Sequence, residues 1–162
     1  MASTKFNQGR FSPINPTKYK GNPGNIQYRS GWELSFMSML DKNPNVLEWS
    51  SEEQAIAYKS PKDNRVHRYF VDFILKMKHP NGKIESMMVE IKPYNQVVAP
   101  KRTPKKNDKA FLKEVVTWGI NQAKWKAALM YAKAKGHNFY VITKDKQDKF
   151  VTLNESQFIM DV

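Results

Sequence analysis

Residues 69–93, YFVDFILKMKHPNGKIESMMVEIKP, contain two apolar runs separated by a turn sequence. Runs of this kind predict two antiparallel strands. Asp72 and Glu90 lie inside the two runs, where a carboxylate is unusual. The turn decides whether these acids share a face of the sheet, because successive side chains of a strand point to opposite faces.

The turn segment HPNGK (79–83) fits a three-residue loop, with Pro80 at the second position of a type I turn and Gly82 in the left-handed region. This loop places Asp72 directly opposite Glu90, so both side chains point the same way. A two-residue Asn-Gly loop would place them on opposite faces. The three-residue loop is the better fit to the sequence.

The other face of the two strands supports this register, because it pairs three apolar residues with three others, and a slip of one residue would scramble those pairs. On the face of the acids, the register places Lys92 opposite Phe70 and Met88 opposite Ile74. Two carboxylates and one ammonium group therefore converge at the end of the hairpin away from the turn. The apolar pairs are Val71–Ile91, Phe73–Val89 and Leu75–Met87.

Two carboxylates this close repel each other unless a cation or a proton lies between them. One interpretation is a structural ion cluster with Lys92, although buried ion pairs stabilise a fold poorly. The other is a Mg²⁺ site, with Mn²⁺ as a substitute, in which Asp72, Glu90 and the Ile91 carbonyl are ligands. Lys92 would then be the catalytic lysine, which positions or deprotonates a water or stabilises charge on a phosphate.

The net charge of +12 is concentrated in two segments. Residues 1–30 carry five Lys and Arg and no acid, and residues 101–135 carry ten bases and two acids. Such clustering is typical of proteins that bind a polyanion, so DNA is the favoured partner, and a solvated basic face is the alternative. A proline-containing loop carries a basic cluster that is suited to contact with DNA phosphates. Its members are Lys101, Arg102, Lys105 and Lys106.

The sequence predicts an irregular basic arm over residues 1–29, followed by one domain over 30–162. No apolar run is long enough for a membrane span, and there is no Cys, which excludes disulfides and thiolate metal sites. We therefore expect a soluble intracellular domain.

A first helix is predicted from Ser30, which forms a capping box with Glu33, to the Asn-Pro at 43–44. A strand over 52–58 and the hairpin follow, then a helix over 110–135 that stops at Gly136, and a strand over 137–145. This order predicts an α/β sandwich built on a mixed sheet. The predicted apolar face of the first helix is Trp32, Phe36, Met39 and Leu40.

The long helix contains several residues that need an interpretation. Gly119 and Asn121 suggest a kink or a break into two helices. Asn121 and Lys124 are candidates for phosphate contact, with a solvated helix face as the alternative. Trp118 and Trp125 are seven residues apart, which predicts one buried face. The three His residues show no metal-ligand spacing, and no acyl-transfer or nucleotide-hydrolysis motif is present.

The pair VD (71–72) and EIK (90–92) resembles the signature of the PD-(D/E)xK nucleases, with Val71 in the place of its proline. The segment 121–143 matches the order of elements in TnsA-like transposase endonucleases and junction resolvases. The resemblance implies a restriction-endonuclease-like core, a mixed sheet flanked by helices, and metal-dependent hydrolysis of DNA. It also implies a helix-borne Glu as a further metal ligand, here Glu33, for which the capping box is the alternative account.

The sequence is also similar to the head-completion nucleases of T4-type tailed phages, over 5–21, 28–36 and 43–53. This implies a virion-assembly protein that acts on packaged DNA during head completion and head–tail joining. The host cytoplasm and the virion are the implied locations, with portal or neck proteins as partners. Two alternatives stay open: a non-catalytic basic DNA-binding protein on a relic nuclease fold, and a transposon-type end-cleaving subunit.

Overall fold

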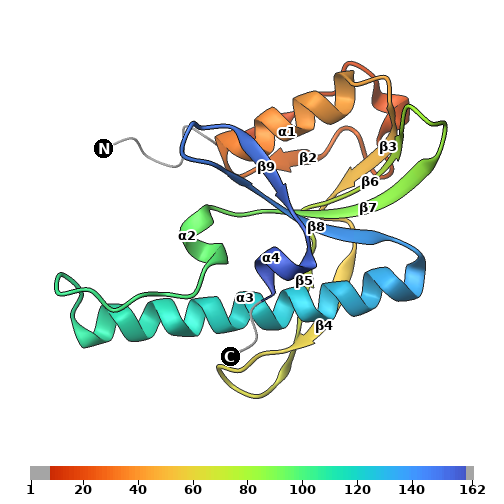
Figure 1. Ribbon diagram of the computed structural model, residues 1–162. Helices are drawn as coiled ribbons and strands as arrows, with labels where there is room; N and C mark the ends of the chain where they lie inside the picture. The colour runs from red at the N-terminus through yellow and green to blue at the C-terminus, as the bar shows by residue number, and fades with distance from the viewer. Residues whose placement is uncertain (1–7, 160–162) are drawn as a thin grey trace.

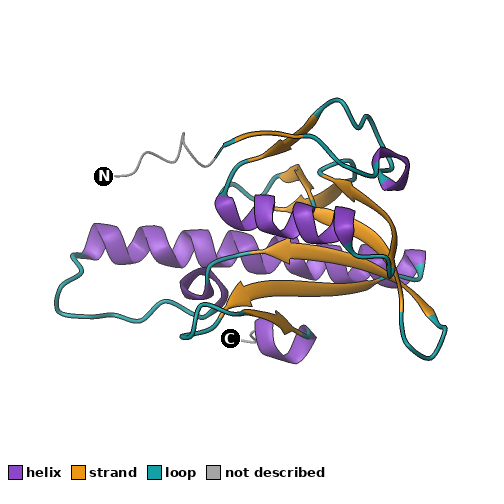
Figure 2. Cartoon of the chain, turned by 90° about the horizontal axis from the view of Figure 1, so that it is seen from above, coloured by secondary structure: helices purple, strands orange, loops and turns teal. Residues whose placement is uncertain are grey.

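The computed structural model describes residues 8–159. A five-stranded mixed sheet forms its middle layer, with α1 (Gly31–Lys42) over one face and α3 (Asp108–Lys135) over the other (Figures 1 and 2). All neighbours in the sheet are antiparallel except β7 and β8, which are parallel. The predicted α/β sandwich is confirmed. The strands, in spatial order, are β3 (Val46–Ser51), β6 (Phe73–Lys78), β7 (Ile84–Ile91), β8 (Asn138–Lys144) and β9 (Phe150–Leu153).

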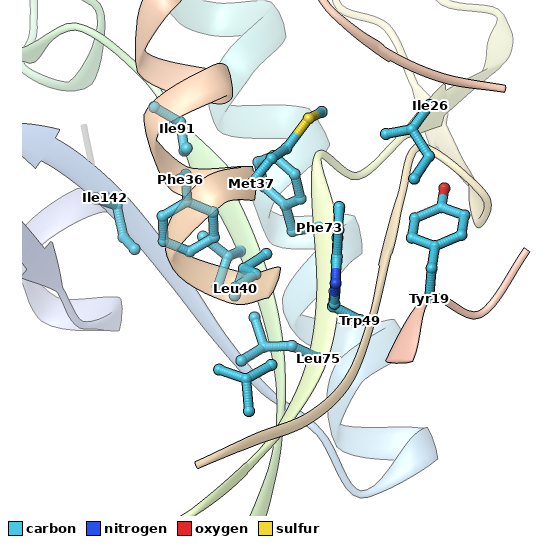
Figure 3. Packing of buried hydrophobic residues seen from close by; sticks show 12 residues of the cluster. Tyr19, Ile26, Phe36, Met37, Leu40, Trp49, Phe73, Leu75, Ile91 and Ile142 are labelled. Atoms are coloured by element: carbon cyan, nitrogen blue, oxygen red, sulfur yellow. The ribbon is translucent and has the colours of Figure 1, made fainter. Parts of the chain in front are cut away.

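Alternate residues of the central strands fill two separate cores, because both faces of the sheet are covered. Val89 of β7 packs in the core on the α1 side, and its neighbour Met88 packs in the core on the α3 side. Ile142 and Val141 of β8 repeat this alternation. Figure 3 shows the α1-side core, where Phe36 lies against Phe73 with ring centres 4.9 Å apart.

The predicted register of the β6–β7 hairpin is confirmed. The three pairs farthest from the turn are Phe73–Val89, Ile74–Met88 and Leu75–Met87. The turn is the predicted three-residue loop, because the His79 amide donates to the Lys83 carbonyl at 2.8 Å. Gly82 has φ +84°, in the left-handed region that glycine adopts without a steric cost.

The first strand of the hairpin is shorter than predicted, and the expected Phe70–Lys92 and Val71–Ile91 pairs are wrong, because the ladder ends at Phe73–Val89 and Val71 and Ile91 pack in opposite cores. The chain leaves the sheet at Val71, whose amide bonds to the Gln54 carbonyl at 3.4 Å. Upstream of this break, β5 (Val66–Phe70) pairs with β4 (Ala55–Lys59) in a separate two-stranded sheet, so Phe70 lies opposite Ala55. Asp72 therefore lies between the five-stranded sheet and the β4–β5 sheet.

The first helix begins and ends at the predicted residues, with one bond of the predicted capping box present. The Ser30 hydroxyl accepts from the Glu33 amide at 3.1 Å, and the Asn43 amide donates to the Met39 carbonyl at 2.9 Å. The predicted apolar face is partly wrong, since Met39 is 38% exposed and Met37 is fully buried. Met37 is covered because the N-terminal segment packs over that side of the helix, as Figure 3 shows for Ile26.

Residues 9–28 are folded, which corrects the predicted irregular conformation over this part of the segment; residues 1–7 of the predicted arm lie outside the described residues. Tyr19 and Ile26 are buried in the α1-side core. The Lys18 ammonium donates to three carbonyls at the end of α1, at 2.8 to 2.9 Å, where a cation complements the helix dipole. The elements are β1 (Gly9–Phe11), the 3₁₀ helix η2 (Pro16–Lys18) and β2 (Ile26–Tyr28).

The long helix α3 is continuous, without the predicted break at Gly119, and it ends at Gly136 with φ +74°. Trp125 is buried as predicted, whereas Trp118 is only partly buried. No helix in the described range is long and apolar enough to cross a membrane. Outside the N-terminal segment, β3 and α2 (Tyr94–Val97) were not predicted, and β9 and α4 (Glu155–Phe158) follow the last predicted strand.

Candidate active site

A pocket of about 740 Å³, which we call the acid pocket, opens at the end of the β6–β7 hairpin away from the turn. Asp72, Glu90 and Lys92 all line it, so the structure brings together the three side chains that the register placed on one face. Glu33 and Lys124 line the same pocket from the two flanking helices. The other lining residues are Asn25, Gln27, Arg29, Ser51, Glu52, Glu53, Arg68, Tyr69 and Phe70.

Asp72 and Glu90 are held against each other by reciprocal bonds to backbone amides. The Asp72 amide donates to Glu90 Oε1 at 3.1 Å, and the Ile91 amide donates to Asp72 Oδ2 at 2.8 Å. Glu90 is only 4% exposed. These bonds form because the pairing between the two strands ends before Asp72. The amides of Asp72 and Ile91 are then free to bond to the carboxylates instead of to a neighbouring strand.

The two carboxylates disfavour each other's ionised form. Burial, and then the charge of Glu90, raise the pKa of Asp72 well above its usual range. Burial also raises the pKa of Glu90 to about 7, although the Lys92 ammonium and the bond from the Asp72 amide oppose this rise. The pair is therefore short of positive charge, even with Lys92 beside it.

Two lysines face the acid pair from different elements. Lys92 follows β7 directly, and its amide donates to the Ile142 carbonyl of β8 at 3.0 Å, which fixes its position. Lys124 comes from the middle of α3, and its ammonium lies 5.7 Å from the ring centres of both Tyr58 and Tyr69. Burial and the charge of Lys92 lower the pKa of Lys124. The aromatic rings hold this ammonium by cation–π attraction.

Glu33 lies in the first turn of α1, where its backbone is part of the Ser30 cap while its side chain lines the pocket. Burial raises the pKa of Glu33, and its charge contributes to the raised pKa of Asp72. Within residues 8–159, however, no three His, Cys, Asp or Glu side chains are grouped closely enough to hold a metal ion together. The role of Glu33 as a metal ligand therefore stays a prediction.

Glu52 is a pocket residue that the sequence did not indicate. It has φ +53°, which is unusual for a residue other than glycine, and strain of this kind concentrates at functional sites. Its amide donates to the Asp72 carbonyl at 3.1 Å, and its side chain forms an ion pair with Arg29. The only sequence signal is the acidic pair at 52–53 directly after β3.

Tyr69 is a second pocket residue that was not predicted. Its hydroxyl is buried and bonds to no other described residue. Burial and the charges of Glu90 and Asp72 raise its pKa, so the hydroxyl remains a hydrogen-bond donor at neutral pH. The hydroxyl is therefore a buried donor without a protein acceptor, close to the two carboxylates.

The other residues predicted to contact DNA lie outside this pocket. Asn121 is only 4% exposed and does not line the pocket, because its side chain faces the interior of the protein. The cluster 101–106 precedes α3 and partly pairs with the first turns of that helix: Arg102 forms an ion pair with Asp108, and Lys106 one with Glu114 at 2.8 Å. Among the residues predicted to bind nucleic acid, Lys124 alone lines the acid pocket.

The donor set of the pocket fits a divalent cation. Asp72 and Glu90 offer hard carboxylate oxygens, and the bonds to backbone amides use one oxygen of each. Mg²⁺ is commonly bound by one or two carboxylates and keeps several waters, which a pocket of this volume can contain. The raised pKa values indicate the same need, because a cation between the carboxylates would favour their ionised forms.

The chain is similar to known nucleases. Residues 43–144, which include Asp72, Glu90, Lys92 and Lys124, match the family described as TnsA-like endonuclease N terminal. The head completion nuclease of Enterobacteria phage T4 is 38% identical over 140 residues, which cover 85% of this chain and 91% of that protein. No solved structure matches the chain significantly. The chain belongs to the TnsA-like endonuclease N-terminal family, within the restriction-endonuclease-like superfamily of nucleases.

Proposed function

We propose that the protein is a Mg²⁺-dependent deoxyribonuclease that hydrolyses phosphodiester bonds, with Mn²⁺ able to substitute. The observation that carries the proposal is the pair of half-buried Asp72 and buried Glu90, whose pKa values are raised and which lies beside Lys92 in an open pocket. A pair with only a structural role would be expected to have enough positive partners to stay ionised. The net charge of +12 supports a polyanionic substrate.

Asp72, Glu90 and the Ile91 carbonyl would hold the ion, which when bound supplies Lewis-acid activation of a phosphoryl oxygen and lowers the pKa of a bound water. The Asp72–Glu90 pair is fixed before substrate arrives, because two backbone amides orient it. Lys92 lies at the end of β7, where its ammonium can orient a water or stabilise the charge that develops on the phosphate.

Lys124 would bind the scissile phosphate from the α3 side. Its ammonium is already oriented by two aromatic rings, so it loses little freedom when it meets an anion. Under this proposal, the DNA strand would enter the pocket on the side of the carboxylates where Lys124 lies.

We further propose that the DNA is packaged phage DNA and that the protein acts during head completion and head–tail joining, with portal or neck proteins as partners. The name of the T4 relative and the 91% of its length that the match covers support this role. Under this proposal the protein acts in the host cytoplasm during assembly or in the virion.

The test is cleavage of supercoiled plasmid by the purified protein with Mg²⁺ or Mn²⁺, and with EDTA. We expect nicked or linear products with either ion and none with EDTA. Lys92→Ala should not cut, whereas the matched surface variant Lys83→Ala should cut like the natural protein. A folded protein that binds the plasmid but leaves it intact in both ions would contradict the proposal and favour a non-catalytic DNA-binding role.

A further inference from the structure

The β4–β5 hairpin extends past α3, away from the central sheet (Figure 1). Its turn is closed by two bonds, from the Ser60 amide to the Arg65 carbonyl at 2.9 Å and from the Asn64 amide to the Ser60 carbonyl at 2.8 Å. Residues 55–70 contain four Lys and Arg and one acid, which gives +4 − 1 = +3. We call these residues the basic hairpin.

The inner face of the basic hairpin is anchored to the body of the protein. Ile56 and Tyr69 are buried in the α3-side core, at 3% and 7% exposure. Tyr58 packs edge-on against Tyr69, with ring centres 5.9 Å apart, and the Lys124 ammonium lies over both rings. The hairpin therefore has a fixed direction at its root.

The outer face of the basic hairpin is exposed and continues into the acid pocket. Arg68 and Phe70 alternate with buried Tyr69 along β5, and both line the pocket. Their partners on β4 are alanines, Ala57 opposite Arg68 and Ala55 opposite Phe70. Because the alanines are small, a bulky polymer can approach this face closely while the Arg68 side chain reaches it.

The charges of the basic hairpin are not neutralised by the rest of the protein. Its bases, Lys59, Lys62, Arg65 and Arg68, form no ion pair with any acid in residues 8–159. Its one acid, Asp63, is paired with His67 at 2.8 Å. The cluster 101–106 differs in this respect, because two of its four bases are paired with acids of α3.

We propose that the basic hairpin binds the phosphate backbone of duplex DNA on one side of the acid pocket, a proposal that rests on the proposed nuclease function. The charge matches a polyanion, and the outer face continues into the pocket where the DNA would be cut. Five residues per strand give an arm of about 17 Å, which spans about five base pairs. Lys and Arg contacts of this kind position DNA without reading its sequence.

The test measures DNA binding in EDTA, so that no strand is cut, as a function of salt concentration. The double variant Lys62→Ala/Arg65→Ala removes two exposed charges at the tip of the hairpin, and the control Lys78→Ala/Lys83→Ala removes two exposed charges at the β6–β7 turn. We expect the slope of log K against log salt to fall by up to about 1.8 in the tip variant, roughly 0.9 per contact, and to stay unchanged in the control.

The tip variant should also give a shorter hydroxyl-radical footprint on a DNA that binds the protein at one defined position. We expect the footprint to lose about five base pairs, and on one side of the cleavage site alone. An unchanged slope with an unchanged footprint would overturn the role of the hairpin, even if the natural protein cuts DNA. A reduced slope in a protein that cuts DNA with neither Mg²⁺ nor Mn²⁺ would keep the hairpin as a DNA contact while the nuclease proposal fails. Thermal melts confirm that each variant is folded.

Discussion

Two glutamates of the same strand, Glu85 and Glu90, have opposite electrostatic surroundings. At the turn end of β7, Glu85 accepts bonds from His79 Nε2 at 2.7 Å, Asn138 Nδ2 at 2.6 Å and the Tyr140 hydroxyl. Burial acts to raise the pKa of Glu85, but these bonds outweigh it and the pKa is lowered. The Glu85 carboxylate is therefore stabilised in its ionised form by hydrogen-bond donors of the protein itself.

At the other end of β7, Glu90 accepts one amide bond and lies beside a second carboxylate, Asp72. Its pKa is raised to about 7 by burial. The comparison shows two kinds of carboxylate in one strand: Glu85 is supplied with donors by its neighbours, whereas Glu90 keeps a raised pKa despite the nearby Lys92, as would be expected of a residue that binds an added cation.

The largest expected effect is the loss of cleavage in Glu90→Gln. The substitution keeps the shape of the side chain but removes a charge that would hold the metal ion, so we expect a loss of more than about a hundredfold, the upper end for a residue that only supports a ligand. Lys92→Ala should lose activity to a similar extent. Plasmid cleavage with Mg²⁺ measures both.

Glu85→Gln is the matched control at the turn end of the same strand. Cleavage should stay within a few-fold of the natural protein, while the free energy of unfolding falls by about 1–3 kcal/mol, because donors that now serve a carboxylate lose a charged acceptor. Equal losses of cleavage in Glu85→Gln and Glu90→Gln, both folded, would break the comparison.

The next effect concerns stability and pH without a divalent ion. Because the pKa of Glu90 is raised from 4.5 to about 7 on folding, the folded protein binds more protons than the unfolded chain between these values. Stability should therefore fall as pH rises from about 4.5 to about 7, by roughly 3 kcal/mol from this residue. Denaturant melts in EDTA measure it, and Mg²⁺ should restore the lost stability.

Glu90→Gln should remove most of that pH dependence, since the side chain no longer titrates. Glu85 acts with the opposite sign: its lowered pKa adds stability above the unfolded value, which is lost as pH falls through the folded value. A Glu90→Gln protein with the same pH profile as the natural protein would show that the acid pair does not destabilise the ion-free fold.

Glu33→Gln tests whether the acid pocket uses a third carboxylate. If Glu33 only belongs to the helix cap, glutamine replaces it with a stability change below about 1 kcal/mol and nearly full activity. If it supports the metal, directly or through a water, cleavage should fall by about 10–100-fold, with partial rescue by high Mn²⁺ and little change in Tm. We expect the second outcome, because its charge already acts on Asp72.

The smallest effect is expected for the cluster 101–106. Two of its four bases are paired with Asp108 and Glu114, so neutralising all four should lower the slope of log K against log salt by about 1.8 rather than 3.6. An unchanged slope would assign the cluster to a protein partner.

The register of the β6–β7 hairpin was predictable because a five-residue turn sequence determines it. The convergence of Asp72, Glu90 and Lys92 followed directly. The end of strand pairing at Val71 was not predictable from the sequence. It depends on Gln54, 17 residues earlier, whose carbonyl accepts a hydrogen bond from the Val71 amide. Strand β3 was missed for a similar reason: Trp49 is buried by contacts with Tyr19 and Phe73 from distant parts of the chain.

The pocket residues divide in the same way. Those on the hairpin were predicted from local pattern and spacing. Glu52 and Tyr69 were missed because their place in the pocket follows from how β4 and β5 leave the central sheet. Asn121 was wrongly expected at the surface, since the sequence does not show which side of α3 faces the sheet. Residues brought in by tertiary packing leave little local signal.

The most direct test of the central claim is titration of the purified protein with Mn²⁺, followed by electron paramagnetic resonance and calorimetry at pH 8. The acid pair should bind Mn²⁺ in the natural protein and in Glu85→Gln, and Mg²⁺ should compete for the site. Glu90→Gln, with a melt that shows it folded, should lose this binding. Equal Mn²⁺ binding by Glu90→Gln and the natural protein would contradict the claim that Asp72 and Glu90 form the metal site.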